Sequence, residues 1–149
     1  MKISGVYTLP APKDRAYASL QDPALLAQCM PGCEKLEQIG PDEYAMTMKM
    51  AVAAVSGLFD GTVRIADAQP TDRFRLIVEG QGKIGFLKGE GAILLESAGE
   101  GQTAVHYDGE VHVGGTIAAV GSRLVDSTSK MMIKRFFEKF ATLVSRRLA

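Results

Sequence analysis

The sequence has no tryptophan, only two cysteines and only two histidines among its 149 residues. Two cysteines are too few for a disulfide framework, so the fold must depend on a hydrophobic core. A chain of this length buries roughly 68–70% of its unfolded surface, which favours a single domain over residues 1–149. An excess of one charge is lacking too, because 17 basic residues balance 17 acidic ones. There is no global positive field and no basic groove with interleaved aromatics, so nucleic-acid binding is not expected.

Long apolar runs are also missing. No segment approaches the roughly 18–20 apolar residues that are needed to cross a bilayer. Before Pro10 there is one lysine and no apolar stretch, which is unlike a signal peptide. We therefore expect a cytoplasmic protein, with peripheral contact at the inner face of the cell membrane as an open alternative.

Short strand-forming segments separated by turn signals dominate the chain up to Gly114. No helix of ten residues lies between those after residue 32, which favours antiparallel hairpins over parallel crossovers. Two short helices are expected after the first strand, divided by Pro23, with Asp22 as the cap of the second. The predicted strands are 2–9, 33–39, 43–55, 58–68, 73–83, 86–97 and 103–113.

One long helix is predicted over residues 116–148, which contain no proline. The order of elements predicts an α+β fold in which a curved seven-stranded antiparallel sheet, with the two short helices, wraps around this C-terminal helix. At 100° per residue, one face of the helix gathers apolar residues that include Val125, Met132 and Phe136.

Cys29 and Cys33 flank the segment Met30-Pro31-Gly32. A zinc site needs four ligands, and neither a second cysteine pair nor a histidine cluster supplies them, so no metal is expected. Pro31 disfavours a continuous helix, so the two thiols need not share a face. The favoured interpretation is a turn in which Cys29 ends a helix and Cys33 begins a strand. A reversible disulfide is the less favoured alternative.

The last predicted strand carries two histidines and two carboxylates at alternate positions, which places them on one face. These residues are His106, Asp108, Glu110 and His112. Since alternate Cα atoms of a strand are about 6.6–6.8 Å apart, one metal ion reaches only about two of them. A solvated outer face is the favoured interpretation.

Residues Gly80 to Gly85 match the pattern G-x-G-x-x-G of dinucleotide-binding loops. Such a loop must follow a strand and open a helix. Here more strand-forming sequence follows, so we interpret the match as chance.

Glycines occupy several positions on the predicted inner face of the central strands, where a core normally holds bulky side chains. Glycines in strands usually mark bulges and bends that curl a sheet. They also leave volume, and empty apolar volume costs about 24 cal/mol per Å³, so a hollow interior suggests a ligand. Methionines line such a space adaptably. The predicted cavity residues are Met46, Met48, Met50, Phe74, Leu76, Val78, Gly80, Leu87, Gly89, Gly91, Tyr107, Val125, Thr128, Met132 and Phe136.

Two lysine-rich segments are candidates for contact with a membrane or a protein partner. One is a predicted hairpin tip with exposed apolar residues between lysines, for which a solvent-tolerant turn is the alternative. The other is a basic face of the last helix that includes an aromatic residue, for which a solvated face is the alternative. The predicted contact residues are Lys83, Ile84, Phe86, Leu87, Lys88, Lys130, Lys134 and Phe137.

Four segments resemble successive blocks of the CoxG family of carbon monoxide dehydrogenase proteins, which belongs to the START-like (SRPBCC) helix-grip superfamily. They are PALLAQCMPGCEKLE, GLFDGTVRI, GQGKIGFLKGEGAILL and VGGTIAAVGSRLVD. The resemblance implies a seven-stranded sheet that grips the last helix, with an apolar cavity between them. It also implies an accessory role beside molybdenum hydroxylases of the CO dehydrogenase type, in membrane recruitment and quinone handling.

The leading hypothesis is therefore a non-catalytic protein that binds an apolar small molecule, a quinone- or lipid-like ligand, and needs no other cofactor. Its expected partners are CO dehydrogenase or molybdenum hydroxylase subunits. One alternative is a cavity enzyme of the polyketide cyclase/dehydratase type, which places acid–base groups inside the cavity. Tyr44, Tyr107, Thr128 and Asp126 are the inward candidates for such groups. The other alternative is a docking or maturation adaptor without a ligand.

Overall fold

Seven antiparallel strands form one sheet in the order β1-β7-β6-β5-β4-β3-β2. The computed structural model describes residues 1–148. The strands are β1 (Lys2–Leu9), β2 (Cys33–Gly40), β3 (Glu43–Val52), β4 (Val55–Gln69), β5 (Arg73–Gly82), β6 (Gly85–Ser97) and β7 (Thr103–Gly114). Seven strands and their antiparallel pairing confirm the predicted fold class. The turn between β3 and β4 falls at Ala53 and Ala54, slightly earlier than predicted.

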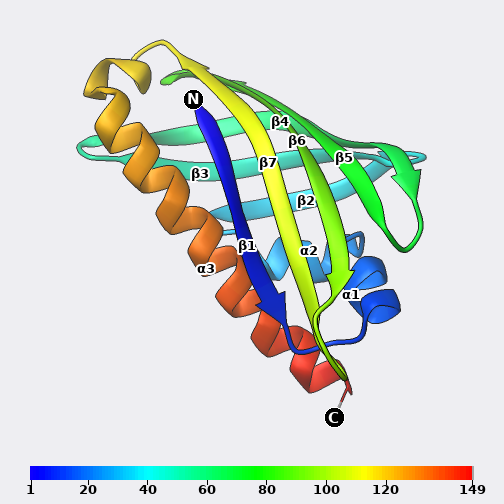
Figure 1. Ribbon diagram of the computed structural model, residues 1–149. Helices are drawn as coiled ribbons and strands as arrows, with labels where there is room; N and C mark the ends of the chain where they lie inside the picture. The colour runs from blue at the N-terminus through cyan, green and yellow to red at the C-terminus, as the bar shows by residue number, and fades with distance from the viewer. Residues whose placement is uncertain (149) are drawn as a thin grey trace.

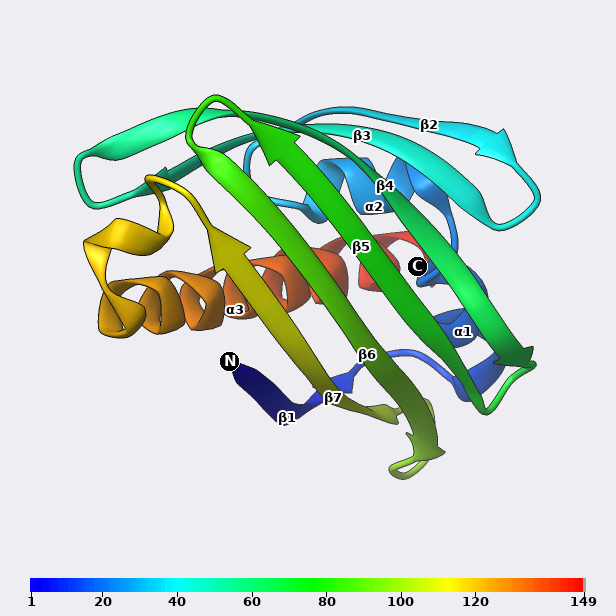
Figure 2. The ribbon, with the colours of Figure 1, turned by 90° about the horizontal axis from the view of Figure 1, so that it is seen from above.

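The two edge strands, β1 and β2, lie on either side of the long helix α3 (Ser122–Leu148) because the sheet curls. Figure 1 shows α3 running obliquely beside β1, and Figure 2 shows the central strands arching over it. Two short helices, α1 (Lys13–Ser19) and α2 (Pro23–Cys29), lie on the same side of the sheet as α3. The sheet therefore has a concave face turned to the helices and a convex face turned to solvent.

The predicted cap of α2 is present. Oδ1 of Asp22 accepts hydrogen bonds from the backbone N–H of Ala24 at 3.0 Å and of Leu25 at 3.4 Å. Pro23 follows at the first helical position, where its fixed φ suits the helix and its missing N–H costs nothing. These two residues explain why the helical segment after β1 breaks in two.

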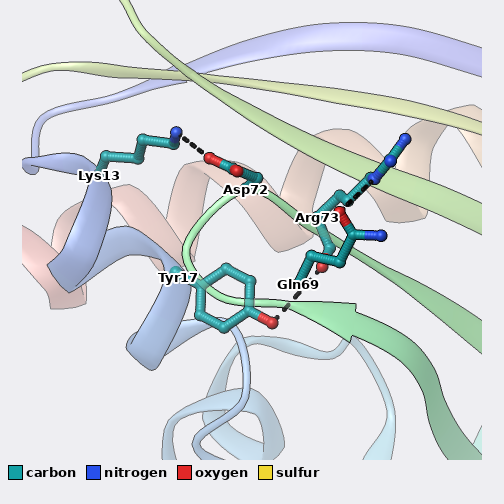
Figure 3. Close-up of polar contacts among 5 residues, drawn as sticks. All are labelled: Lys13, Tyr17, Gln69, Asp72 and Arg73. Atoms are coloured by element: carbon teal, nitrogen blue, oxygen red, sulfur yellow. Dashed lines mark hydrogen bonds and ion pairs between the residues drawn. The ribbon is translucent and has the colours of Figure 1, made fainter.

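Polar contacts attach α1 to the turn between β4 and β5 (Figure 3). The ammonium group of Lys13 forms an ion pair with Asp72. The hydrogen bond and the charge of Lys13 lower the pKa of that carboxyl. The Tyr17 hydroxyl donates to the carbonyl of Arg73 at 3.5 Å, and the Arg73 side chain donates to Gln69 at 3.3 Å. Together these contacts fix α1 over one end of the sheet.

The last helix starts later than the predicted residue 116. A short 3₁₀ helix, η1 (Ala118–Val120), comes first, and α3 begins at Ser122. Gly121, between them, has φ +104°, which lies outside the helical region and prevents one continuous helix. Ile117 is 2% exposed, and its N–H donates to the carbonyl of Ile84 at 2.8 Å. Residues 116–121 therefore cap one end of the sheet.

Two separate clusters of buried side chains hold the ends of the concave face. The larger cluster, called here the packed end, lies where α1, α2 and the C-terminal half of α3 meet the sheet, and it includes Leu9, Phe74, Leu95, Phe140 and Val144. The smaller cluster consists of Val52, Phe59 and Ile117, with neighbours such as Ile84 and Val113. The concave face between the clusters is covered by the N-terminal half of α3.

Candidate functional site

The concave face between the two clusters, called here the middle floor, holds most of the predicted cavity residues. Their side chains alternate inward along the strands as predicted, but most are only half-buried. Met46, Met48, Phe74 and Val125 are buried. The half-buried ones are Met50, Leu76, Val78, Gly80, Leu87, Gly89, Gly91, Tyr107, Thr128, Met132 and Phe136. Solvent thus reaches apolar side chains on the inner face of the sheet, as expected of a binding surface.

The glycines of the sheet divide into two groups. A Cβ at Gly61 would lie 2.0 Å from the carbonyl oxygen of Glu79, so this glycine allows a close approach of β4 and β5. By contrast, a Cβ at Gly80 would meet nothing closer than 3.8 Å, and one at Gly89 nothing closer than 3.6 Å. Gly61 therefore serves the curvature of the sheet, whereas Gly80 and Gly89 leave room on the middle floor.

A pocket of about 430 Å³ opens between the edge strand β1 and α3, and we call it the β1–α3 pocket. This volume lies within the range of small-molecule sites, which is about 300–1,000 Å³. Its lining residues are Lys2, Ile3, Ser4, Tyr7, Tyr107, Asp126, Lys130, Ile133, Lys134 and Phe137. Of the predicted cavity residues, only Tyr107 is among them. The cavity predicted around Met48, Gly89 and Met132 stays a prediction.

Three aromatic rings form the apolar wall of the β1–α3 pocket. Phe137 stacks on Tyr7, with ring centroids 5.1 Å apart and planes 12° apart. It also stacks on Tyr107, at 5.7 Å and 23°. The ring of Tyr107 lies over Gly5, where a Cβ would be 2.4 Å from the tyrosine oxygen. The missing side chain at Gly5 thus lets Tyr107 reach from β7 towards the edge of the sheet.

The assignment of Phe137 to a solvent-facing contact surface is wrong. Its side chain is 6% exposed and belongs to the packed end. The prediction assumed one narrow buried stripe on α3, as for a helix that lies on a flat sheet. Because β1 and β7 curl around one side of this helix, a second row of residues is buried there. Lys130 and Lys134 do lie in solvent, with side chains 73% and 75% exposed.

Charged groups surround the mouth of the β1–α3 pocket. Lys130 is 2.9 Å from Asp126, and Lys134 is 3.9 Å from Glu138. Lys2 forms no ion pair with any residue in the described part of the chain. Among the lining residues, three lysines therefore stand against one aspartate. Sequence reasoning named Asp126 as an inward candidate but missed Lys2 and Tyr7, because nothing in the sequence shows that β1 becomes an edge beside α3.

The predicted hairpin tip between β5 and β6 is only partly exposed. Lys83 and Lys88 are exposed, and Phe86 is 45% exposed. Ile84, expected to project into solvent, instead packs against the smaller core cluster. Leu87 is half-buried on the inner face, which agrees with its assignment to the cavity and not with its assignment to a contact surface. The turn needs Ile84 because η1 closes over it.

The two cysteines are free, and the favoured interpretation of a turn is confirmed. Cys29 is the last residue of α2, and Cys33 is the first of β2. Burial raises the pKa of the Cys29 thiol to about 11, although Lys139 opposes the shift. Burial also raises the pKa of Cys33, against the hydrogen bond from its thiol to the carbonyl of Lys35. Raised thiol pKa values disfavour the thiolate, which is the reactive form.

The polar row of β7 lies on the convex face, as predicted, with Asp108, Glu110 and His112 exposed. His106 is beside Glu96, at 3.2 Å, on the same face. No group of three histidine, cysteine or acidic side chains suited to a metal ion occurs within residues 1–148. The G-x-G-x-x-G match spans the hairpin between β5 and β6 and opens no helix, which confirms that it is chance.

Comparison with known proteins identifies relatives over nearly the whole chain. The model of the carbon monoxide dehydrogenase family CoxG matches residues 5–145. A conserved protein from Geobacillus kaustophilus, known from its crystal structure, is 32% identical, with a TM-score of 0.93 over 98% of this chain and 96% of that one. No curated protein matches the sequence significantly.

Two more distant structures share the fold. A START superfamily protein from Mycobacterium smegmatis has a TM-score of 0.73 at 12% identity and covers 97% of each chain. The Zhui aromatase/cyclase from a Streptomyces species has a TM-score of 0.70 at 13% identity, over 100% of this chain and 96% of that one. At such identities the likeness concerns the fold alone. Among the helices in the described residues, none is long and apolar enough to span a membrane.

Proposed function

The chain belongs to the CoxG family, and from that premise we propose that it is a non-catalytic accessory protein that binds an apolar, quinone- or isoprenoid-like ligand. The family description links its members to carbon monoxide dehydrogenase, of which CoxG is named as a subunit. The proposed role is to help a molybdenum hydroxylase of this type associate with the membrane or exchange electrons with quinone.

The observation that carries the proposal is the half-buried middle floor. Leu76, Val78 and Leu87 face α3 but are not covered by it as fully as the residues of the packed end. Exposed apolar area is unfavourable in water by about 25 cal/mol per Å², so a surface of this kind is stabilised when an apolar guest covers it. Room at Gly80 and Gly89 supports the same interpretation.

A non-catalytic role is favoured over cyclisation by the placement of the titratable groups. Cyclases of this fold need an acid–base pair that faces the substrate. His112 is exposed on the convex face of the sheet, and His106 lies on the same face beside Glu96. Tyr44 faces inward, but burial raises the pKa of its hydroxyl, which disfavours it as a base.

Ligand binding is tested with decylubiquinone, measured by isothermal titration calorimetry. Replacing Gly89 by leucine fills the space on the middle floor, and we expect binding to weaken by about tenfold, the effect of one misplaced hydrophobic group. Ala92→Leu is the matched control, because Ala92 lies exposed on the convex face of the same strand. Absence of quinone binding by the wild type, or equal weakening in both variants, contradicts the proposal.

The proposed partner is tested by affinity purification of the tagged protein from its native host. We expect molybdenum hydroxylase subunits to co-purify and to be identified by mass spectrometry. Recovery of the protein alone, at native expression levels and without detergent, counts against the accessory role.

Membrane association is proposed to involve the β5–β6 tip, where the exposed ring of Phe86 lies between Lys83 and Lys88. Lysines beside an exposed apolar group suit an anionic lipid surface. Phe86→Ser is expected to reduce co-sedimentation with phosphatidylglycerol vesicles. Leu94→Ser is the control, since Leu94 is 38% exposed at the other end of the same strand. Equal co-sedimentation of both variants and the wild type argues against this contact.

A further inference from the structure

The β1–α3 pocket differs in chemistry from the middle floor. Its walls combine aromatic rings with the aliphatic side chains of Ile3 and Ile133, whereas its mouth carries Lys2, Lys130 and Lys134. A neutral quinone makes no use of three ammonium groups. From this combination we infer that the pocket binds a small amphipathic anion, with its apolar body against the rings and its anionic group at the lysines.

The backbone of β1 adds hydrogen-bonding groups to the same mouth. Met1 and Val111 exchange two hydrogen bonds, of 3.0 and 2.8 Å, across β1 and β7. In an antiparallel pair the next residue turns its N–H and C=O the other way, so those of Lys2 and Ser4 face the free edge. That edge lies beside α3. The backbone N–H of Ser4 is thus a fixed donor for an anion placed between the strand and the helix.

The ion pairs already present at the mouth do not prevent this binding. Lys130 and Asp126 are both solvent-accessible, as are Lys134 and Glu138. Exposed pairs of this kind contribute little, typically 0.2–1 kcal/mol, so the lysines can exchange partners at small cost. A ligand anion held by two or three lysines and a backbone N–H replaces these contacts with several charge-assisted ones. Asp126 is the one lining group that opposes an anion.

Two aryl naphthalene dyes provide matched probes. Anilinonaphthalene sulfonate is an anion, whereas N-phenyl-1-naphthylamine has the same rings without the sulfonate and is neutral. The inferred site is expected to bind the anionic dye more tightly, and salt is expected to weaken only that dye because it screens exposed charges. Equal affinities at all salt concentrations contradict the inference. Fluorescence titration measures both dissociation constants.

Variants on α3 locate the site. Lys130→Ala/Lys134→Ala is expected to weaken the anionic dye by about tenfold and to leave the neutral dye unchanged. The control Arg135→Ala/Lys139→Ala removes the same charge at the same spacing from exposed positions outside the pocket. Asp126→Asn is expected to tighten the anionic dye about threefold, because it removes the opposing charge and frees Lys130.

The outcomes that overturn the inference are equal losses in the two double variants or a weaker complex in Asp126→Asn. All the changed side chains are at least partly exposed, so misfolding does not obscure the result. The inference does not rest on the proposed quinone function: loss of quinone binding in Gly89→Leu with an intact dye site separates the two.

A free anion and the head group of an anionic lipid offer the same chemistry to the lysines. Displacement of the bound dye distinguishes them. Displacement by 2-naphthoate identifies a soluble anion, and displacement by phosphatidylglycerol vesicles identifies a lipid head group. Displacement by neither contradicts the inference.

Discussion

The two halves of α3 face the same sheet but meet it differently. The C-terminal half packs Phe140 and Val144, exposed by at most 1%, against the packed end. The N-terminal half lays Thr128 and Met132, both half-buried, over the middle floor. Both halves of the helix and all the strands carry alternating or periodic apolar residues. The difference teaches that an apolar pattern specifies which face turns inward and not whether that face is filled.

The largest expected effect tests this contrast on one strand. Leu95 at the packed end is 1% exposed, whereas Leu87 on the middle floor is half-buried on the same face of β6. Leu95→Ala removes a fully packed side chain and is expected to lower the free energy of unfolding by about 3–4 kcal/mol. Leu87→Ala is expected to cost about 1 kcal/mol, because the lost side chain was already in contact with solvent.

Urea denaturation monitored by circular dichroism measures both values. Equal losses for the two leucines would show that the middle floor is packed like a core, and the contrast between the halves of the helix would be wrong.

A second contrast concerns glycines that look alike in the sequence. Gly61→Ala forces a Cβ against the carbonyl oxygen of Glu79, and we expect a loss of about 2 kcal/mol from backbone displacement. Gly89→Ala places its Cβ at ordinary contact distance from Val111, so the expected change is within about 0.5 kcal/mol. Thermal or urea unfolding of the two variants decides the matter. Similar losses would mean that both glycines serve the curvature of the sheet.

The fold was predictable from the sequence because its signals are local. Pro23, the cap at Asp22 and the turns between strands each act within a few residues, and the structure confirms them. The start of the long helix was not predictable in the same way. Gly121 was taken as a helical residue, and its φ of +104° follows from the closure of η1 over the smaller cluster.

The candidate site was less predictable than the fold. Alternation identified the inner faces correctly, but it could not show that β1 and β7 curl around one side of α3. That curl buries Phe137 and creates the β1–α3 pocket from residues more than a hundred positions apart, such as Lys2 and Lys134. Such a site depends on which strand becomes an edge, and a single sequence carries no local signal for that.

Two threonines extend the comparison to polar groups. Thr103, fully buried at the packed end, donates from Oγ1 to the carbonyl of Ala11 at 2.8 Å. Thr103→Val leaves that carbonyl without this partner, and we expect a loss of about 1 kcal/mol. The hydroxyl of the half-buried Thr128, by comparison, donates to no residue within 1–148. Thr128→Val is therefore expected to be neutral in urea unfolding, and a loss as large as that of Thr103→Val would contradict the comparison.

The smallest expected effect concerns the ion pair that ties α1 to the packed end. Lys13 lowers the pKa of Asp72 in the folded protein, so the pair stabilises the fold above the unfolded-state pKa of the carboxyl. This contribution is lost as the pH falls through the lowered, folded-state pKa. Lys13→Met is thus expected to lower the thermal midpoint slightly at neutral pH and not at all in strong acid. Lys49→Met, at an exposed lysine that forms no ion pair within the described residues, is the control and is expected to show no such pH dependence. A deficit of Lys13→Met that persists in strong acid would mean that packing of the lysine stem, and not its charge, holds α1 in place.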